Sequence, residues 1–410
     1  MARSYGIDIN ESAAIAPIGF CISRTFYYGD RITVSVMTET PGEEFQAPLI
    51  HQSDFEKITQ VVSEHFQTEE AFLGHGIPTY FLKQPQETKR AFLRLLKKLE
   101  SMSLIAFLRR IEGRIVLKVV PKPPVKRSNV LVNWVLFFAT VGTTFVTGYL
   151  LSLDFVDRGI MSNPFIGAVG FTVAIMTILG AHEMGHKLTA NRSGIDATPP
   201  YFIPGPPPIG EVLGLGTFGA VIMQKSLPRN RDALFDVGSS GPIVGFMLAF
   251  VASIVGLMLS PTLLIRGNES FVPSPLVFDL FAIFLLKLPV DHYVLLHPVA
   301  FAGWAGMIVT MLNLLPVAML DGGHAARSLF GEKARTVLTV LSVLFLAIGE
   351  FWPMVFFVLF MSMYRHPGPL DDVSGLSTGR KLLAIVLVAI FVLSSYVHYW
   401  ILYLLGLLGL

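Results

Sequence analysis

Two histidines and a glutamate lie close together in the stretch AHEMGHK, as His182, Glu183 and His186. On a helix, residues four positions apart share a face, so both imidazoles can bind one zinc ion at about 2.0–2.1 Å. The glutamate beside the first histidine is then placed to act as general base on a metal-bound water. The pattern is short, and a chain of this composition contains it by chance in about 1% of cases. It therefore predicts a hydrolytic zinc site that needs support from elsewhere in the chain.

Asp321, in the stretch NLLPVAMLDGGH, is the candidate for a third ligand. A catalytic zinc site uses three protein ligands and keeps one position open. Asp321 stands at the end of a long apolar run, as the two histidines do, and ionisable groups in such places are costly and mostly functional. The alternatives are interfacial histidines facing lipid headgroups and a helix-terminal carboxylate, neither of which holds a metal.

The elements that carry these residues are predicted to be membrane-spanning helices. Of the 410 residues, 52% are hydrophobic and 15% are charged, whereas about a quarter of the residues of a soluble domain are charged. Uncharged runs of about 18 or more residues predict spanning helices, and such runs occur at 128–153, 159–181, 237–265, 293–320 and 382–410. The net charge of +2 argues against a nucleic-acid partner. Cys21 is the only cysteine, which excludes an intrachain disulfide and a cysteine metal site.

The fold class is therefore mainly α, a polytopic membrane protein of about seven spans. We place the spans near 129–152, 164–186, 236–260, 297–320, 335–349, 351–364 and 381–408. Lysine and arginine then concentrate in the loops on the side of the N-terminus, as expected of the cytosolic side. The first residues lack the pattern of a signal peptide, so we expect the chain to begin in the cytosol.

Two details of this topology carry alternatives. The same charge distribution favours splitting 336–364 into a hairpin around GEFWP rather than one long span. The segment LVFDLFAIFLLKLPV, 276–290, contains Asp279 and Lys287. We interpret it as an external interfacial or re-entrant segment, with a further span as the alternative.

Residues 1–120 are predicted to form a small soluble α+β domain in the cytosol, followed by a proline-rich basic linker at 121–128 and the membrane domain at 129–410. Helices are expected at 53–66 and 86–102, a strand at 30–39, and a hairpin at 104–120 that turns near Glu112 and Gly113. We expected two or three strands in all. The domain contains no cluster of catalytic residue types, so we expect a structural or regulatory role.

The two motifs together resemble the site-2 protease family of intramembrane zinc metalloproteases, peptidase family M50. They read HEMGH from His182 and NLLPVAMLDG from Asn313. The stretches GTFGAVIMQKSLPRNRDALFDVGSSGP and HPVAFAGWAGMIVTMLNLLPVAMLDGGHAAR are similar to the prokaryotic and chloroplast branch, whose members carry a soluble N-terminal domain. The resemblance covers about residues 130–380. One departure is Gly245, where many relatives have asparagine.

The resemblance implies cleavage of transmembrane segments of protein substrates within the lipid bilayer, here of a prokaryotic cell membrane. It implies one zinc ion per chain, held by His182, His186 and Asp321, with Glu183 as the general base. A glutamate third ligand is the alternative found in other HExxH proteases. A third ligand of that type would have to lie on a later span, where Glu350, between the predicted spans 335–349 and 351–364, is the only glutamate, and the topology puts it at the opposite face. A zinc-binding membrane protein without hydrolysis, such as a transporter or inactive scaffold, is the alternative function, and it would have no need of Glu183.

Three further features outside the two motifs' proposed ligands are Asn313, His324 and the segment 214–224. On a continuous helix Asn313 would be offset by about 80° from Asp321, with Pro316 kinking the helix between them. Asn313 would donate a hydrogen bond to the substrate carbonyl or oxyanion, or form an interhelical bond. His324 is expected near the site without binding the metal. The segment GLGTFGAVIMQ, 214–224, follows a stretch whose prolines exclude a regular helix, and is expected to re-enter the membrane as a strand that pairs with the substrate. The alternative is an ordinary cytosolic hairpin.

Overall fold

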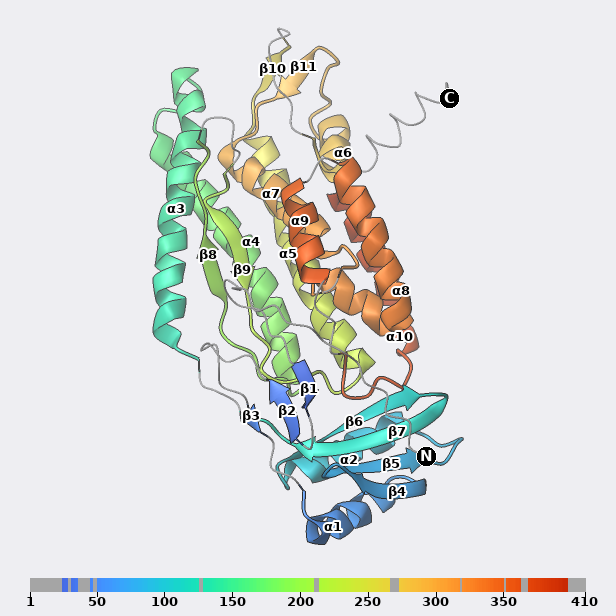
Figure 1. The fold of residues 1–410 in the computed structure, drawn as a ribbon. Coiled ribbons are helices and arrows are strands. Elements are labelled where there is room, and N and C mark those ends of the chain that lie inside the picture. The colour runs from blue at the N-terminus through green and yellow to red at the C-terminus, as the bar shows by residue number, and fades with distance from the viewer. Residues whose placement is uncertain are drawn as a thin grey trace, which may run out of the picture.

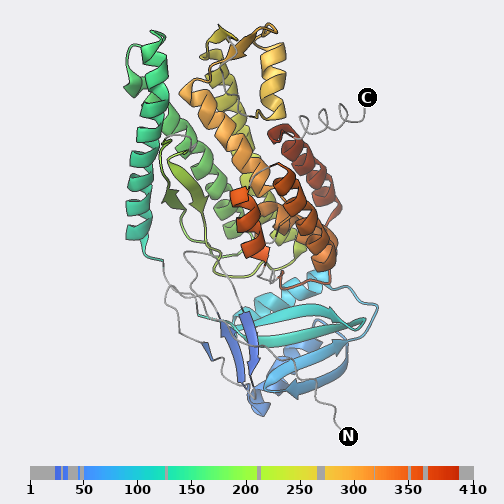
Figure 2. The same cartoon turned by 45° about the horizontal axis from the view of Figure 1, so that its top comes forward.

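The computed structural model describes residues 24–28, 31–35, 45–46, 50–124, 128–209, 214–265, 273–317, 319–349, 352–362 and 368–396. Cys21, Glu350 and the part of the last predicted span beyond 396 lie outside these residues. Figure 1 shows a body of helices above and a domain of strands and helices below, and Figure 2 shows the same division from a second direction. The chain is mainly helical, as predicted.

Three long helices in the helical body confirm the first three predicted spans. They are α3 (Val130–Asp157), α4 (Pro164–Arg192) and α5 (Arg231–Met258). Within the described residues, these three are long and apolar enough to cross a membrane. Each begins after an asparagine whose side chain accepts a hydrogen bond from a backbone amide of the first turn, which satisfies an otherwise unpaired donor. These asparagines are Asn129, Asn163 and Asn230.

Small residues allow the helices to pack closely. A Cβ on Gly256 of α5 would lie 2.1 Å from the backbone nitrogen of Ala300 in α7 (Pro298–Asn313), and one on Gly303 of α7 would lie 2.5 Å from the hydroxyl of Ser253. Apolar burial does not drive helices together inside a bilayer, so close van der Waals contact at glycine and alanine takes its place. α5 contacts α4, α7 and α8 (Asp321–Ile348), and so lies at the centre of the body.

The predicted span at 297–320 is wrong in its second half. α7 ends at Asn313, and Asp321 is the first residue of α8. Pro316 has no amide hydrogen and disfavours helical backbone at the residue before it, so the chain leaves the helix instead of kinking. Asn313 and Asp321 therefore do not share a helix, and the expected 80° offset between them does not apply.

α8 is itself interrupted at Gly331, whose φ of 82° and ψ of −172° are not helical. Asp321 thus stands on a short helical piece, 321–330, and the longer piece after Gly331 corresponds to the predicted span near 335–349. It is followed by α9 (Trp352–Ser362) and α10 (Thr378–Ser394). The separation of α8 from α9 agrees with the expected hairpin around GEFWP.

The segment 276–290 forms a helix of only nine residues, α6 (Leu276–Phe284). At about 1.5 Å per residue it covers less than half of a bilayer core of about 30 Å, which argues against a further helical span. A short antiparallel pair, β10 (Thr262–Leu264) and β11 (His292–Val294), lies beside it at the end of the body away from the soluble domain (Figure 1).

The region expected to form the soluble domain, for which we keep that name, contains an antiparallel sheet of four strands in the order β4-β5-β7-β6. The strands are β4 (Thr68–Gly74), β5 (Ile77–Leu82), β6 (Leu104–Ile111) and β7 (Arg114–Pro121). The helices α1 (Gln52–Ser63) and α2 (Lys89–Glu100) share one apolar core with the sheet. β1 (Arg24–Tyr28), β2 (Arg31–Ser35) and β3 (Phe45–Gln46) form a separate sheet.

Both predicted helices and the hairpin at 104–120 are present, and the turn at Glu112 and Gly113 has positive φ at both residues. The expected number of strands was too small, because the β4–β5 hairpin was not predicted. β4 carries exposed Glu69 and Glu70 in an edge position, so it lacks an apolar alternation. The sequence signal was the turn between the strands, where His75 and Gly76 both have positive φ.

Candidate metal centre

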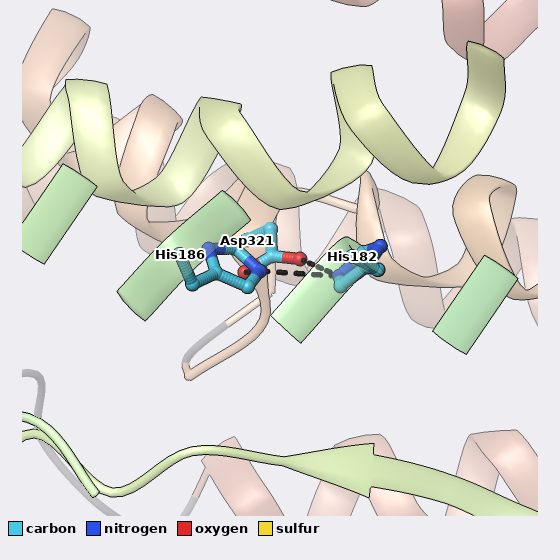
Figure 3. Close-up of side chains that lie close together, drawn as sticks. All are labelled: His182, His186 and Asp321. Carbon is cyan, nitrogen blue, oxygen red and sulfur yellow. Dashed lines mark hydrogen bonds and ion pairs between the residues drawn. The ribbon is translucent and has the colours of Figure 1, made fainter. Parts of the chain in front are cut away.

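α4 and α8 bring His182, His186 and Asp321 together (Figure 3). The Nε2 atoms of the two histidines are 3.1 Å apart. Oδ2 of Asp321 is 3.2 Å from Nε2 of His182, and Oδ1 is 3.2 Å from Nε2 of His186. Both histidines are buried. The three side chains form the one group of potential metal ligands found within the described residues.

The spacing of these donor atoms fits a zinc ion. Ligand bonds of about 2.0–2.1 Å at tetrahedral angles place neighbouring donors about 3.3 Å apart, close to the separations of 3.1 and 3.2 Å between the ligand atoms. Two imidazole nitrogens and one carboxylate are also a donor set that zinc accepts in catalytic sites. The residues present therefore fit the metal.

The backbone of α5 sets the tautomer of His186. Nδ1 of His186 lies 2.7 Å from the carbonyl oxygen of Val237. A carbonyl oxygen only accepts, so Nδ1 carries the hydrogen, and the lone pair of Nε2 is free to bind a metal. Such a bond from the second ring nitrogen also holds the ring in orientation.

Glycines of α5 make room for the two rings. A Cβ on Gly241 would lie 2.1 Å from Nε2 of His186, and one on Gly245 would lie 2.8 Å from Nδ1 of His182. Any side chain at the position of Gly245 would thus need wider spacing between α4 and α5. Gly238 of α5 is also tightly packed, since its Cβ would lie 2.7 Å from Cβ of His324. We had not predicted this role of α5, although the spacing GSSGPIVG was visible in the sequence.

Gly322 allows the start of α8, which carries Asp321, to pack closely against the end of α7. Its Cβ would lie 2.0 Å from the carbonyl oxygen of Leu314 and 2.5 Å from that of Leu315. Any side chain there would push the start of α8 away from the end of α7. Steric exclusion of a side chain therefore explains the glycine that follows Asp321, a role that we had not predicted from the sequence.

Glu183 is buried beside the ligands, and its Oε1 is 4.0 Å from Nε2 of His182. The backbone amide of Ile222 is a hydrogen-bond partner of its carboxylate. Ile222 directly follows β9 (Thr217–Val221), so this strand runs next to the general-base candidate.

β9 pairs antiparallel with β8 (Tyr201–Pro204), and this hairpin lies along α3 among the long helices (Figure 1). The strand expected within 214–224 is thus present. Oγ1 of Thr143 donates to the carbonyl of Gly216 at 2.6 Å, and Nδ2 of Asn133 donates to the carbonyl of Pro200 at 2.9 Å. α3 therefore holds both ends of the hairpin.

Two further candidates, Asn313 and His324, come from α7 and α8. Asn313 is the last residue of α7 and is partly buried. His324 is in the first turn of α8, with its Cβ against Gly238. Neither belongs to the group of potential ligand atoms.

The chain is similar to a family of peptidases and to several curated proteins. Residues 170–349 match the model described as Peptidase family M50. The chain is 31% identical over 244 residues to the probable zinc metalloprotease EGY1, chloroplastic, of Oryza sativa subsp. japonica, covering 56% of this chain and 41% of that protein. It is 30% identical over 243 residues to the protein of the same name from Arabidopsis thaliana, covering 55% and 43%.

A further relative from Arabidopsis thaliana is the probable zinc metalloprotease EGY2, chloroplastic, 29% identical over 211 residues that cover 49% of this chain and 36% of that protein. In these matches, the chain spans about two fifths of the length of its curated relatives. No solved structure matches the chain.

Proposed function

We propose that the chain is an intramembrane zinc metalloendopeptidase of peptidase family M50, whose model matches residues 170–349. It hydrolyses peptide bonds within or next to the transmembrane segments of membrane-protein substrates. The observation that carries the proposal is the group of His182, His186 and Asp321, with Glu183 buried 4.0 Å from the first ligand atom.

In this proposal His182, His186 and Asp321 hold the zinc ion, which supplies activation of water and polarisation of the scissile carbonyl. Glu183 takes the proton of the attacking water and returns it to the leaving amine. Its burial and its bond with the amide of Ile222 hold the carboxylate in one place for both transfers. Asn313 donates a hydrogen bond to the substrate oxygen on which negative charge develops.

The substrate must present an extended peptide, because the backbone bonds of a helix shield its carbonyl groups. We propose that the edge of β9 away from β8 receives this segment as an added strand. An open strand edge is tolerated at membrane depth only where protein or water lines it. The position of the hairpin beside α3 and next to Glu183 supports this role.

We also propose about seven crossings, with the N-terminus and the metal centre toward the cytosolic face of a prokaryotic cell membrane. The position of His182 and His186 in the last turns of α4, at the end nearer the soluble domain, supports a shared side (Figure 1). The prokaryotic membrane rests on the resemblance of the sequence to that branch alone, whereas the names of the relatives are chloroplast names.

A zinc-binding protein without hydrolysis is the competing function. Such a site needs the three ligands but no buried carboxylate beside them, so Glu183 favours the protease.

The test uses purified protein in liposomes with a membrane-spanning test peptide. We expect about one zinc ion per chain, cleavage by the wild type, and loss of cleavage in Glu183→Ala with zinc content unchanged. Cleavage by Glu183→Ala at the wild-type rate would refute the catalytic role. Full zinc occupancy in Asp321→Ala would refute the assignment of Asp321 as the third ligand. Zinc binding by the wild type without cleavage of any test peptide would favour the competing function.

A further inference from the structure

Residues 368–377, which we call the strap, connect the soluble domain to the helices of the metal centre. They lie just before α10, between the helical body and β6 (Figures 1 and 2). On one side the strap pairs with the edge strand β6, because the amide of Leu108 donates to the carbonyl of Leu370 at 2.9 Å and that of Asp372 donates to the carbonyl of Leu108 at 3.1 Å. The strap thus adds a short parallel strand to the sheet of the soluble domain.

On its other side the strap pairs with the residues that lead into α5. The amide of Leu370 donates to the carbonyl of Pro228 at 2.8 Å, and that of Asp371 donates to the carbonyl of Arg229 at 3.0 Å. The strap therefore joins the sheet to the start of α5 through the backbone on both sides.

The carboxylate of Asp372 ties two helices together. It accepts from Nη1 and Nη2 of Arg327 in α8, at 3.1 and 2.5 Å, and from Nε of Arg231, the first residue of α5, at 3.2 Å. Arg327 is buried, with 7% of its surface exposed. A buried guanidinium group is costly unless anions pair with it. Oε2 of Glu332 also lies 3.1 Å from Nε of Arg327, but Asp372 is the partner that links Arg327 to Arg231 and so constrains both helices.

Arg327 lies six residues after Asp321, about 9 Å along the helix axis. Both stand on the short helical piece 321–330, which begins at Asp321 and ends before the non-helical Gly331. Arg327 therefore anchors the far end of the piece whose first residue is the proposed metal ligand. Gly368 of the strap allows this approach, because a Cβ there would lie 3.0 Å from Nη2 of Arg327.

Arg231 connects Asp372 to the helix that packs against the two histidines. It opens α5, whose Val237 carbonyl orients His186 and whose glycines Gly241 and Gly245 contact both rings. Asp372 is thus bonded to both of the helices that position the ligands against α4.

The soluble domain holds the strap through side chains as well. Nζ of Lys89, the first residue of α2, is 2.7 Å from Oδ2 of Asp232 and 3.1 Å from the carbonyl oxygen of Gly375. Nη1 of Arg109 in β6 donates to the carbonyl of Leu370 at 2.7 Å.

We propose that Asp372 is a positioning residue for the metal ligand Asp321, and that the strap transmits the docking of the soluble domain to the metal centre. The inference rests on the proposed zinc site. When the soluble domain and strap are seated, Asp372 pairs with Arg327 and Arg231, and the piece 321–330 is held with Asp321 against the histidines. When they are displaced, Arg327 loses its link to Arg231, the piece that ends at Gly331 is less constrained, and zinc is held less tightly.

The test measures the zinc dissociation constant of the full chain by competition with a chromophoric chelator. We expect Asp372→Asn to weaken zinc binding by about three- to tenfold, a smaller effect than that of residues bonded directly to metal ligands. Asp372→Glu, which keeps the charge, should recover most of the affinity. Lys89→Met removes the contacts of α2 with the strap at Gly375 and with Asp232 of α5, and should weaken zinc binding in the same direction. The matched control is Asp154→Asn, which removes an exposed ion pair with Arg158 in α3.

The folded fraction of each variant is checked by thermal unfolding, and affinities are compared only below the transition. If Asp372→Asn does not fold, Lys89→Met alone decides. Wild-type zinc affinity in every variant that folds would overturn the inference, and so would equal weakening in Asp154→Asn. Failure of the wild type itself to bind zinc would instead refute the proposed metal site.

Discussion

The carbonyl oxygen of Val237 accepts a hydrogen bond from Nδ1 of His186 at 2.7 Å, so the backbone of α5 fixes the side of the ring that faces Asp321. A backbone acceptor cannot be lost by a single side-chain substitution. The distance between α4 and α5, however, depends on the glycines next to Val237, and these can be changed.

We predict that Gly241→Ala abolishes most zinc binding. Its Cβ would lie 2.1 Å from Nε2 of His186, so either the ring or the helix must move. Zinc content and cleavage should fall together, by more than about tenfold, because the ligand itself is displaced.

The matched control is Gly142→Ala in α3, where nothing lies within 4 Å of the added carbon. It should leave zinc content unchanged. Equal zinc content in Gly241→Ala and the wild type would show that α5 does not support the ligand as described.

Asn313→Ala separates the two roles considered for Asn313. If Asn313 stabilises the developing oxyanion, kcat falls by about 10²–10³ while zinc content and KM stay close to wild type. If it only bonds neighbouring helices, the unfolding temperature falls and kcat does not. We expect the first result, measured as kcat and KM on a membrane-spanning test peptide with zinc content in parallel.

Thr143→Val tests the support of the β8–β9 hairpin by α3. The substitution keeps the shape of the side chain and removes the hydroxyl that bonds the carbonyl of Gly216 at 2.6 Å. A bond of this kind contributes about 1 kcal/mol, so kcat/KM should fall about fivefold with zinc content unchanged.

The control for this change is Thr144→Val, one residue further along α3. The hydroxyl of Thr144 bonds only carbonyls of its own helix, those of Thr140 and Val141. A comparable loss of activity in Thr144→Val would mean that α3 itself, rather than the hairpin, is responsible.

The soluble domain should lose stability as the pH falls below the ordinary pKa of histidine, 6.5. Burial lowers the pKa of His65, and its Nε2 lacks a hydrogen-bond partner among the described residues. The folded state therefore binds the proton less readily than the unfolded state. The contribution of His65 to stability is complete above the unfolded pKa and is lost progressively as the pH falls through the folded one.

Hydrogen exchange of the α1 and α2 amides in the full chain, corrected for intrinsic rates, measures this effect between about pH 7 and pH 5. His65→Gln should reduce the loss of protection, whereas a change of the exposed His51 to glutamine should not. Identical pH profiles for wild type and His65→Gln would contradict the prediction.

Local sequence patterns were sufficient to predict those elements that are determined by a single segment of the chain. The three long helices follow from the uncharged runs at 128–153, 159–181 and 237–265, and the 104–120 hairpin follows from alternating apolar residues around a tight turn. The β4–β5 hairpin was not predicted because its outer strand β4 is mostly exposed, and an exposed strand does not need alternating apolar and polar residues.

The span at 297–320 shows why apolar composition alone misleads. The run is uncharged to Leu320, yet Pro316 ends the helix and the start of α8 is held against the end of α7 by the close approach at Gly322. Hydropathy does not distinguish a helix from irregular backbone buried in protein, since both are apolar.

The motif from His182 to His186 predicts two ligands and a base from the sequence alone, because a helix puts residues four apart on one face. The type of Asp321 and its place at the end of an apolar run also identified it as a candidate. The arrival of its carboxylate 3.2 Å from both histidines is a property of the tertiary structure only. It depends on the break before α8, the glycine surface of α5 and the buried pair of Arg327 with Asp372, all of which are contacts between segments far apart in the chain.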